Sequence, residues 1–204
     1  MQPFTHLTST IVCLPQRKID TDQIIPARYL KGTSREGYGD HLFADWRYHP
    51  DGSPDPAFPL NQPLAGQAQL LLAGDNFGCG SSREHAAWAL LGFGLRAVIS
   101  TSFADIFHNN ALKNGLLPIR LSPADHQALL EIVQSQPGVQ FSIDLEKQTL
   151  QQAGSPAGFQ ASFPVEPFAK ECLLAGMDEL GYLLAHEEQI AAFEQRRAYQ
   201  DLQL

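Results

Sequence analysis

A short glycine-rich segment carries the residues best suited to chemistry. Residues 74–85 read GDNFGCGSSREH and run from an apolar stretch into a helical pattern. The first N–H groups of a helix have no partners inside the helix, so they attract anions, and glycines let a ligand approach the backbone closely. Ser81 and Ser82 add hydroxyl groups, and the guanidinium of Arg83 fits a carboxylate with two hydrogen bonds. This pattern predicts a pocket for a carboxylate or a phosphate.

The same loop does not match the common phosphate and nucleophile motifs. It has no Lys for a Walker P-loop, Arg83 stands where a dinucleotide fingerprint needs a glycine, and neither serine lies in a GxSxG elbow. A plain turn with Ser81 as the helix N-cap is an alternative. His85, four residues after Ser81 and on the same helical face, suits a Ser–His relay or a brace. Cys79 suits an activated thiol or a small space-filling residue.

Two segments upstream contain further charged residues. Residues 19–30, IDTDQIIPARYL, place Asp20 and Asp22 before apolar residues. That arrangement suits a helix N-cap with acids in the first turn, or acids that orient a nearby cation or a partner chain. Residues 31–40, KGTSREGYGD, combine three glycines with the positive charge of Arg35. Loops of this composition act as substrate lids or are ordinary surface loops.

An alternation of strand and helix patterns must position these segments. Short apolar runs separated by helical periodicity predict β-α-β-α-β steps, hence parallel strands with right-handed crossovers. Alternating apolar residues at 139–145 and 159–165 predict antiparallel strands. The other predicted elements are strands at 70–73, 97–100 and 116–121, helices at 83–94 and 103–114, a helix opened by Ser122 and Pro123, and a helical tail from about residue 167. Five prolines between residues 50 and 63 predict an irregular excursion.

The composition is that of an ordinary globular chain with negative charge. The chain has 204 residues, 44% hydrophobic and 18% charged, which suits one folded domain. With 14 Lys+Arg against 22 Asp+Glu, the formal net charge is −8, which disfavours nucleic acid as a partner. No apolar run approaches the ~20 residues that span a bilayer, and the first ten residues show no leader pattern. We therefore expect no membrane partner and a cytoplasmic location.

The cysteines are few and scattered. Cys13, Cys79 and Cys172 are an odd number, and no two of them are close in sequence. This argues against a disulfide framework. Because CxxC-type spacing is missing, it also argues against a metal or cluster held by this chain alone.

Four segments together resemble one known family. They are IDTDQIIPARYLK (19–31), GDNFGCGSSREHAAWALLGFG (74–94), SFADIFHNNALKNGLLPI (102–119) and KECLLAGMDELGYLLAHEEQIAAFE (170–194). In this order they resemble the small subunits of 3-isopropylmalate dehydratase over nearly the whole chain, and FGCGSSREH resembles the swivelling domain of aconitases. The resemblance implies an α/β fold, a single three-layer β/β/α swivelling domain over residues 1–204 with mixed parallel and antiparallel strands.

The resemblance also implies a division of labour between two chains. A separate large subunit holds a [4Fe-4S] cluster, and this chain binds no cofactor or metal itself. The enzyme removes water from 2-isopropylmalate, a small dicarboxylate, and returns it in the other orientation to give 3-isopropylmalate for leucine biosynthesis. Ser81 is the implied base. The implied substrate-binding residues are Ser82, Arg83, Arg35 and Thr33, and the implied supporting residues are Asp20, Asp22 and His85.

Two positions depart from the family pattern. Ala87 stands where the family usually has Pro, and Glu36 stands where it usually has Thr between Arg and Gly. Glu36 puts a negative charge where substrate carboxylates would approach. The alternative function is therefore that of a related hydro-lyase acting on another 2-alkylmalate, citramalate or homocitrate. An anion-binding module and a non-catalytic regulator are alternatives from other functional classes, and a regulator would have no need of Arg83.

Overall fold

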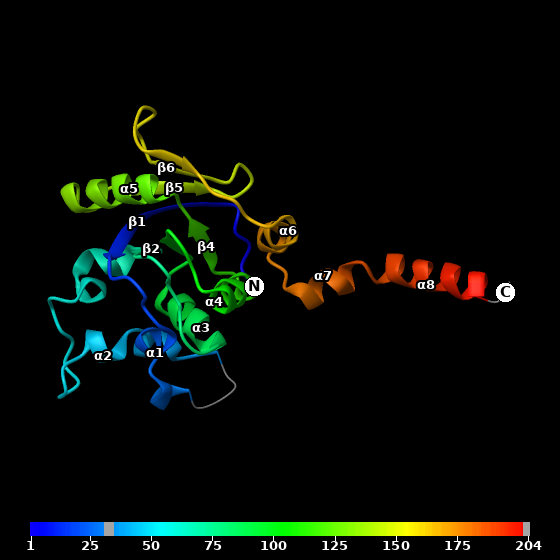
Figure 1. The fold of residues 1–204 in the computed structure, drawn as a ribbon, viewed down its shortest axis with the longest axis horizontal. Helices are drawn as coiled ribbons and strands as arrows, with labels where there is room; N and C mark the ends of the chain where they lie inside the picture. The colour runs from blue at the N-terminus through cyan, green and yellow to red at the C-terminus, as the bar shows by residue number, and fades with distance from the viewer. Residues whose placement is uncertain (31–34, 202–204) are drawn as a thin grey trace.

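The strands form one curled sheet that is parallel in one half and antiparallel in the other. The computed structural model describes residues 1–30 and 35–201 (Figure 1). The sheet order is β4-β3-β2-β1-β5-β6-β7. Strands β1 to β4 pair in parallel, and β1, β5, β6 and β7 pair antiparallel. The strands span His6–Leu14 (β1), Leu70–Ala73 (β2), Ala97–Ser100 (β3), Leu117–Arg120 (β4), Gln140–Asp144 (β5), Thr149–Gln152 (β6) and Gln160–Ser162 (β7).

The two faces of the parallel strands are covered by different layers. Leu71 and Val98 belong to a core shared with the helices that follow β2 and β3. Leu70 and Ile99 belong to a second core, shared with residues of the antiparallel strands such as Phe141. In Figure 1, β5 and β6 accordingly lie on one side of the parallel strands, and α3 and α4 lie on the other. This arrangement confirms the predicted β/β/α layering with mixed strands.

The helices after the parallel strands begin and end as local chemistry requires. α3 (Glu84–Phe93) and α4 (Asp105–Asn114) end at Gly94 and Gly115, whose φ angles are 106° and 86°. Such left-handed angles favour glycine. α5 (Pro123–Ser135) starts behind Ser122, whose hydroxyl accepts a hydrogen bond from the Asp125 N–H at 3.1 Å. The helix start predicted at Ser122 and Pro123 is confirmed.

Short elements fill the connection between β1 and β2. They are α1 (Thr21–Ile24), α2 (Ala44–Arg47) and the 3₁₀ turns η1 (Ala27–Tyr29), η2 (Tyr38–His41), η3 (Pro59–Asn61) and η4 (Pro63–Gln67). The predicted irregular excursion at residues 50–63 contains the short 3₁₀ turn η3. That turn starts with Pro59, because a proline at the first helical position loses no backbone hydrogen bond. Leu60 is buried, so this stretch packs on the core.

The chain ends in three helices, two of which extend away from the sheet. α6 (Pro167–Ala175) packs beside the sheet, whereas α7 (Glu179–Ala185) and α8 (Glu187–Asp201) point outward (Figure 1). Large apolar side chains on α7 and α8, including Leu180 and Phe193, are exposed. In the part of the chain that the structure describes, no helix combines the length and apolar character needed to cross a membrane.

Candidate functional site

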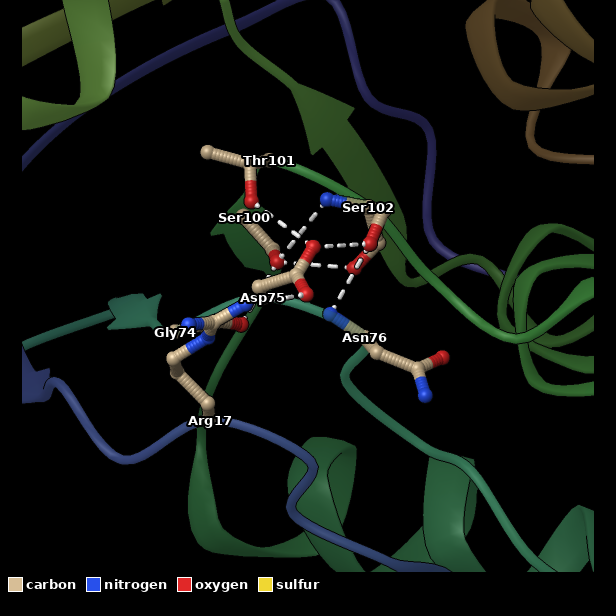
Figure 2. Close-up of polar contacts among 7 residues, drawn as sticks. All are labelled: Arg17, Gly74, Asp75, Asn76, Ser100, Thr101 and Ser102. Atoms are coloured by element: carbon tan, nitrogen blue, oxygen red, sulfur yellow. Dashed lines mark hydrogen bonds and ion pairs between the residues drawn. The ribbon is translucent and has the colours of Figure 1, made fainter. Parts of the chain in front are cut away.

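The glycine-rich loop, residues 74–83, leaves the carboxyl end of β2 and is fixed at its root by Asp75 (Figure 2). One carboxylate oxygen of Asp75 accepts hydrogen bonds from the hydroxyls of Ser102, at 2.5 Å, and Thr101, at 3.2 Å. The other oxygen pairs with Arg17 at 3.3 Å. The Ser102 hydroxyl lowers the pKa of Asp75 below its ordinary value, and Arg17 adds to this effect. The root is therefore joined both to the segment after β3 and to the segment after β1.

The middle of the loop runs along the segment after β3. The Phe77 N–H donates to Ser102 O at 3.1 Å, and the Ala104 N–H donates to Phe77 O at 3.0 Å. Gly78 has a φ of 74°, and a Cβ built there would lie 2.2 Å from Cγ of Phe107. Both the angle and the space require glycine at this position. The side chain of Phe107 thus determines how closely the loop packs on α4.

On its opposite side, the loop is bonded to residues 18–21. The Lys18 N–H donates to Asp75 O at 2.7 Å, and the Gly78 N–H donates to Ile19 O at 2.8 Å. Thr21 then binds the loop twice. Its N–H donates to Cys79 O at 2.9 Å, and its hydroxyl donates to Ser81 O at 2.9 Å. The loop is therefore held from two sides by segments that are distant in sequence.

Ser81 and Ser82 are exposed and lie before the helix. The N-cap of α3 is Arg83, with extended backbone (φ −143°, ψ 109°) and no side-chain capping bond. The alternative in which Ser81 caps the helix is therefore wrong, and so is the placement of Ser81 and His85 on one helical face. The extended backbone at Arg83 delays the helix to Glu84. Within the described residues, no hydrogen bond engages the Ser81 hydroxyl.

Arg83 is paired with Asp22, and this contact brings the first two sequence segments together. The Arg83 side chain is only 16% exposed, and its Nη1 forms an ion pair with the Asp22 carboxylate. The hydrogen bond from Arg83 lowers the pKa of Asp22. Asp20 instead caps α1, accepting from the Gln23 N–H at 2.7 Å within a capping box. Asp20 thus serves as the predicted helix N-cap, whereas Asp22 is the acid that pairs with a nearby cation.

The neighbouring acid, Glu84, has a different partner. The amide nitrogen of Asn114 donates to Glu84 Oε1 at 2.8 Å, and the indole N–H of Trp88 donates to Asn114 Oδ1 at 2.9 Å. Asn114 is 6% exposed. These bonds tie the first turns of α3 to the end of α4, so they hold the helix start next to the loop.

An aromatic cluster connects the start of α3 with the segment at residues 35–41. The ring of His85 lies 5.1 Å from Tyr38 and 4.6 Å from Trp88, between ring centroids. The guanidinium of Arg35 lies 5.5 Å from the centre of the Trp88 ring. His85 therefore packs as a brace, and among the described residues it has no hydrogen bond to Ser81. Thr33 lies outside the described residues.

Two glycines allow the backbones of η2 and α3 to touch. A Cβ built on Gly39 would lie 2.3 Å from the backbone carbon of Gly92, and one on Gly92 would lie 2.9 Å from the Gly39 nitrogen. Neither glycine was singled out from the sequence for this contact, and Thr21, Tyr38 and Trp88 were also missed. The glycines themselves were the available signal, because Gly92 interrupts a helical pattern where glycine is costly without a packing reason.

The described residues do not fit an iron–sulfur cluster. They contain no group of three or more His, Cys, Asp or Glu side chains that could hold a metal ion. Burial raises the pKa of the Cys13 thiol to about 11. Burial also raises the pKa of Cys79 and of Cys172, so all three cysteines favour the thiol over the ligating thiolate. For Cys79 this disagrees with the hypothesis of an activated thiol.

Comparison with known proteins agrees with this fold and loop. Residues 1–124 match the aconitase C-terminal domain family. A 3-isopropylmalate dehydratase small subunit of Anaeromyxobacter dehalogenans is 56% identical over 95% of this chain and 98% of its own length. One of Roseiflexus castenholzii is 53% identical over 95% of this chain and 94% of its own. The chain belongs to the family of 3-isopropylmalate dehydratase small subunits.

A solved structure gives the same result at lower identity. The crystal structure of a 3-isopropylmalate dehydratase from Methanocaldococcus jannaschii superimposes with a TM-score of 0.64 at 28% sequence identity. The match covers 93% of this chain and 99% of that chain. The predicted family and fold are therefore confirmed.

Proposed function

We propose that this chain supplies the base and a carboxylate-binding arginine to a two-chain hydro-lyase. The enzyme converts 2-isopropylmalate to 3-isopropylmalate through 2-isopropylmaleate, a step of leucine biosynthesis in the cytoplasm. The observation that supports this most is the Ser81 hydroxyl. It is exposed on a loop that is bonded from two sides and lies next to Arg83 at the start of α3. A rigid loop with an accessible oxygen suits a group that must meet one carbon of a bound substrate.

The proposed step is a proton transfer. Ser81 Oγ, as its alkoxide, takes the proton from the carbon next to a carboxylate of 2-isopropylmalate, and the hydroxyl group leaves the neighbouring carbon as hydroxide. The proton and the hydroxide together account for the water that is removed. Returning a proton and a hydroxide to the double bond in the opposite orientation gives 3-isopropylmalate. A serine is a poor base unless its anion is stabilised. Among the described residues no side chain caps the start of α3, so backbone N–H groups there and the charge of Arg83 are the groups that would stabilise that anion.

The proposed substrate contacts surround this oxygen. Arg83 is the main carboxylate ligand, because Asp22 holds one of its terminal nitrogens and, among the described residues, no hydrogen bond or ion pair engages its other N–H groups. Ser82 adds a hydroxyl donor on the exposed loop. Arg35, across the aromatic cluster, and Thr33 are proposed to contact the other end of the dicarboxylate.

A second chain is part of this proposal. The described residues do not fit an iron–sulfur cluster, so we assign the [4Fe-4S] cluster of the enzyme to the large subunit, which would complete the active site. A related hydro-lyase acting on citramalate, homocitrate or another 2-alkylmalate is the second candidate. The exposed Glu36 favours it, because that position would adjoin the substrate.

Reconstitution tests the proposal. The chain is purified alone and together with a 3-isopropylmalate dehydratase large subunit, and iron, sulfide and turnover of a panel of 2-alkylmalates are measured. We expect turnover only in the mixture, the highest kcat/KM for 2-isopropylmalate, and no iron in the lone chain. Stoichiometric cluster in the lone chain would overturn the assignment of the cluster, and a different preferred substrate would favour the second candidate.

A further inference from the structure

We propose that Thr21 is a positioning residue for the reaction, and that its hydroxyl fixes the orientation of Ser81. This inference rests on the proposed role of Ser81 as the base. Thr21 lies sixty residues earlier in the chain, yet its hydroxyl donates to the backbone carbonyl of Ser81 at 2.9 Å. Thr21 touches the loop from the side of α1 and, in this proposal, has no contact with substrate.

The position of this hydrogen bond within the loop explains why it would control the orientation of Ser81. The root is fixed by the Asp75 network drawn in Figure 2, and the middle is fixed by the backbone bonds of Phe77 and Gly78. Beyond these contacts comes Gly80, with a φ of 93°. A glycine there gives the following peptide many accessible orientations. Among the described residues, the Thr21 hydroxyl makes the hydrogen bond that reaches past Gly80 to the Ser81 backbone.

Thr21 is itself held firmly. It is 2% exposed, and it is the first residue of α1, directly behind the capping box formed by Asp20 and Gln23. Its own N–H is bonded to Cys79 O at 2.9 Å. Thr21 therefore donates two hydrogen bonds to the loop, one on each side of Gly80. Because Thr21 is buried and held in place, it restrains the loop instead of moving with it.

The consequence for catalysis follows from the planarity of the peptide bond. Because the carbonyl of Ser81 and the N–H of Ser82 belong to one plane, fixing the carbonyl fixes both. The Cα of Ser81 lies in the same plane, so the point from which its hydroxyl side chain extends is fixed as well. Displacements of about 1 Å from a reactive geometry cost on the order of 10²-fold in rate. Arg83 is held independently by Asp22, so substrate binding should suffer less than proton transfer.

The test uses Thr21→Val in the complex with the large subunit, because valine has the shape of threonine without the hydroxyl. We expect kcat to fall roughly 10- to 100-fold with KM changed less than about threefold. Thr21→Ser restores the hydroxyl and should recover at least a third of the wild-type kcat. The matched control is Thr10→Val on β1, since the Thr10 hydroxyl is buried and has no hydrogen-bond partner within the described residues. That control should keep wild-type kinetics.

Three outcomes separate this proposal from the one on which it rests. If Ser81→Ala retains turnover, the role of Ser81 as the base fails, and that of Thr21 fails with it. If Ser81→Ala is inactive but Thr21→Val keeps the wild-type kcat, only the role of Thr21 is overturned. If Thr21→Val assembles poorly, Thr21→Ser decides. A kcat of Thr21→Ser below a third of the wild-type value, at wild-type melting temperature, contradicts a role for the hydroxyl. Support requires the kcat loss and its rescue by serine together.

Discussion

The loop at residues 74–83 and the segment at residues 35–41 lie on either side of the start of α3, and they are held in different ways. The loop is bonded to neighbours on both sides, from Asp75 at its root to Ser81 near its end. The segment is attached through the backbone contact of Gly39 with Gly92, through ring contacts of Tyr38, and through side-chain hydrogen bonds from Arg47 and Tyr48 to its carbonyl groups. Arg35 adds a cation–π contact at an exposed position.

This difference matches the roles proposed for the two regions. Proton transfer depends on a fixed distance and angle, and hydrogen bonds from two sides provide them. Discrimination between alkyl groups depends on contacts that are made when substrate is bound, and a segment that exposes Arg35 and Glu36 suits this role. The predicted effects of substitution therefore divide into rate losses for the loop and changes of stability or preference for the segment.

The largest effect is expected at Ser81 itself. Ser81→Ala should lower kcat of the assembled enzyme by about 10²-fold or more, as expected for loss of an acid–base group. Because Ser81 is exposed and is not a helix cap, the stability change should stay within ~0.5 kcal/mol. Steady-state kinetics and melting temperatures measure both. Ser135→Ala, at the remote end of α5, is the control, and equal kinetics of the two variants would remove Ser81 from the chemistry.

The next largest effect concerns Arg83. Arg83→Lys keeps one charge near Asp22 but loses the planar fork, so kcat/KM should fall roughly 30- to 150-fold, equivalent to ~2–3 kcal/mol. Arg28→Lys is the matched control, because Arg28 pairs with Asp45 at an exposed position, where such pairs contribute ~0–1 kcal/mol. A change in kcat/KM below about threefold for Arg83→Lys, within that surface-pair range, would mean that Arg83 pairs with Asp22 but does not bind substrate.

A moderate effect on stability is expected where the segment meets α3. In Gly39→Ala the new methyl group would collide with the backbone of Gly92, and overpacking of this kind costs ~1–3 kcal/mol. Denaturant unfolding measures the loss. Gly66→Ala should be neutral or slightly stabilising, since a Cβ there has no neighbour within 4 Å. Equal stability of the two variants would show that η2 is not anchored through this contact.

The smallest effect on stability, and the most specific one, is expected at Glu36. Glu36→Thr should alter the relative kcat/KM for isopropyl-, methyl- and unbranched malates, because it removes a negative charge beside the proposed carboxylate site. The folding free energy should change by ~0.5 kcal/mol or less, as is usual for exposed positions. An unchanged substrate ranking would separate this segment from substrate selection.

The parallel half of the fold was predictable because both faces of its strands are buried. Leu70, Leu71 and Leu72 are fully buried, so the strand appears as a continuous apolar run between turn signals. β1 was missed although it lies at the centre of the sheet. Its first half, which pairs with β5, includes exposed polar residues such as Thr8, and only its second half is apolar. β6 was missed because Leu150 is its one buried residue.

The candidate site was predictable only in part. The glycines, Ser81 and Arg83 stand in one segment, so the loop and its preference for anions follow from local sequence. The start of α3 was placed too early, because Arg83 has extended backbone and its side chain pairs with Asp22, sixty-one residues away. The hydrogen bond between Thr21 and Ser81 likewise joins residues that are far apart in the sequence. Such contacts leave no periodicity in the sequence.

The most direct test of the central claim follows the proton rather than the product. The assembled enzyme is incubated with 2-isopropylmalate in D₂O, and deuterium incorporation at the carbon next to the carboxylate is measured by NMR for wild type and for Ser81→Ala. If Ser81 is the base, the wild-type enzyme should introduce deuterium as it equilibrates the substrate, and the variant should do so at least about 10²-fold more slowly. Incorporation at the wild-type rate in the variant would contradict the account.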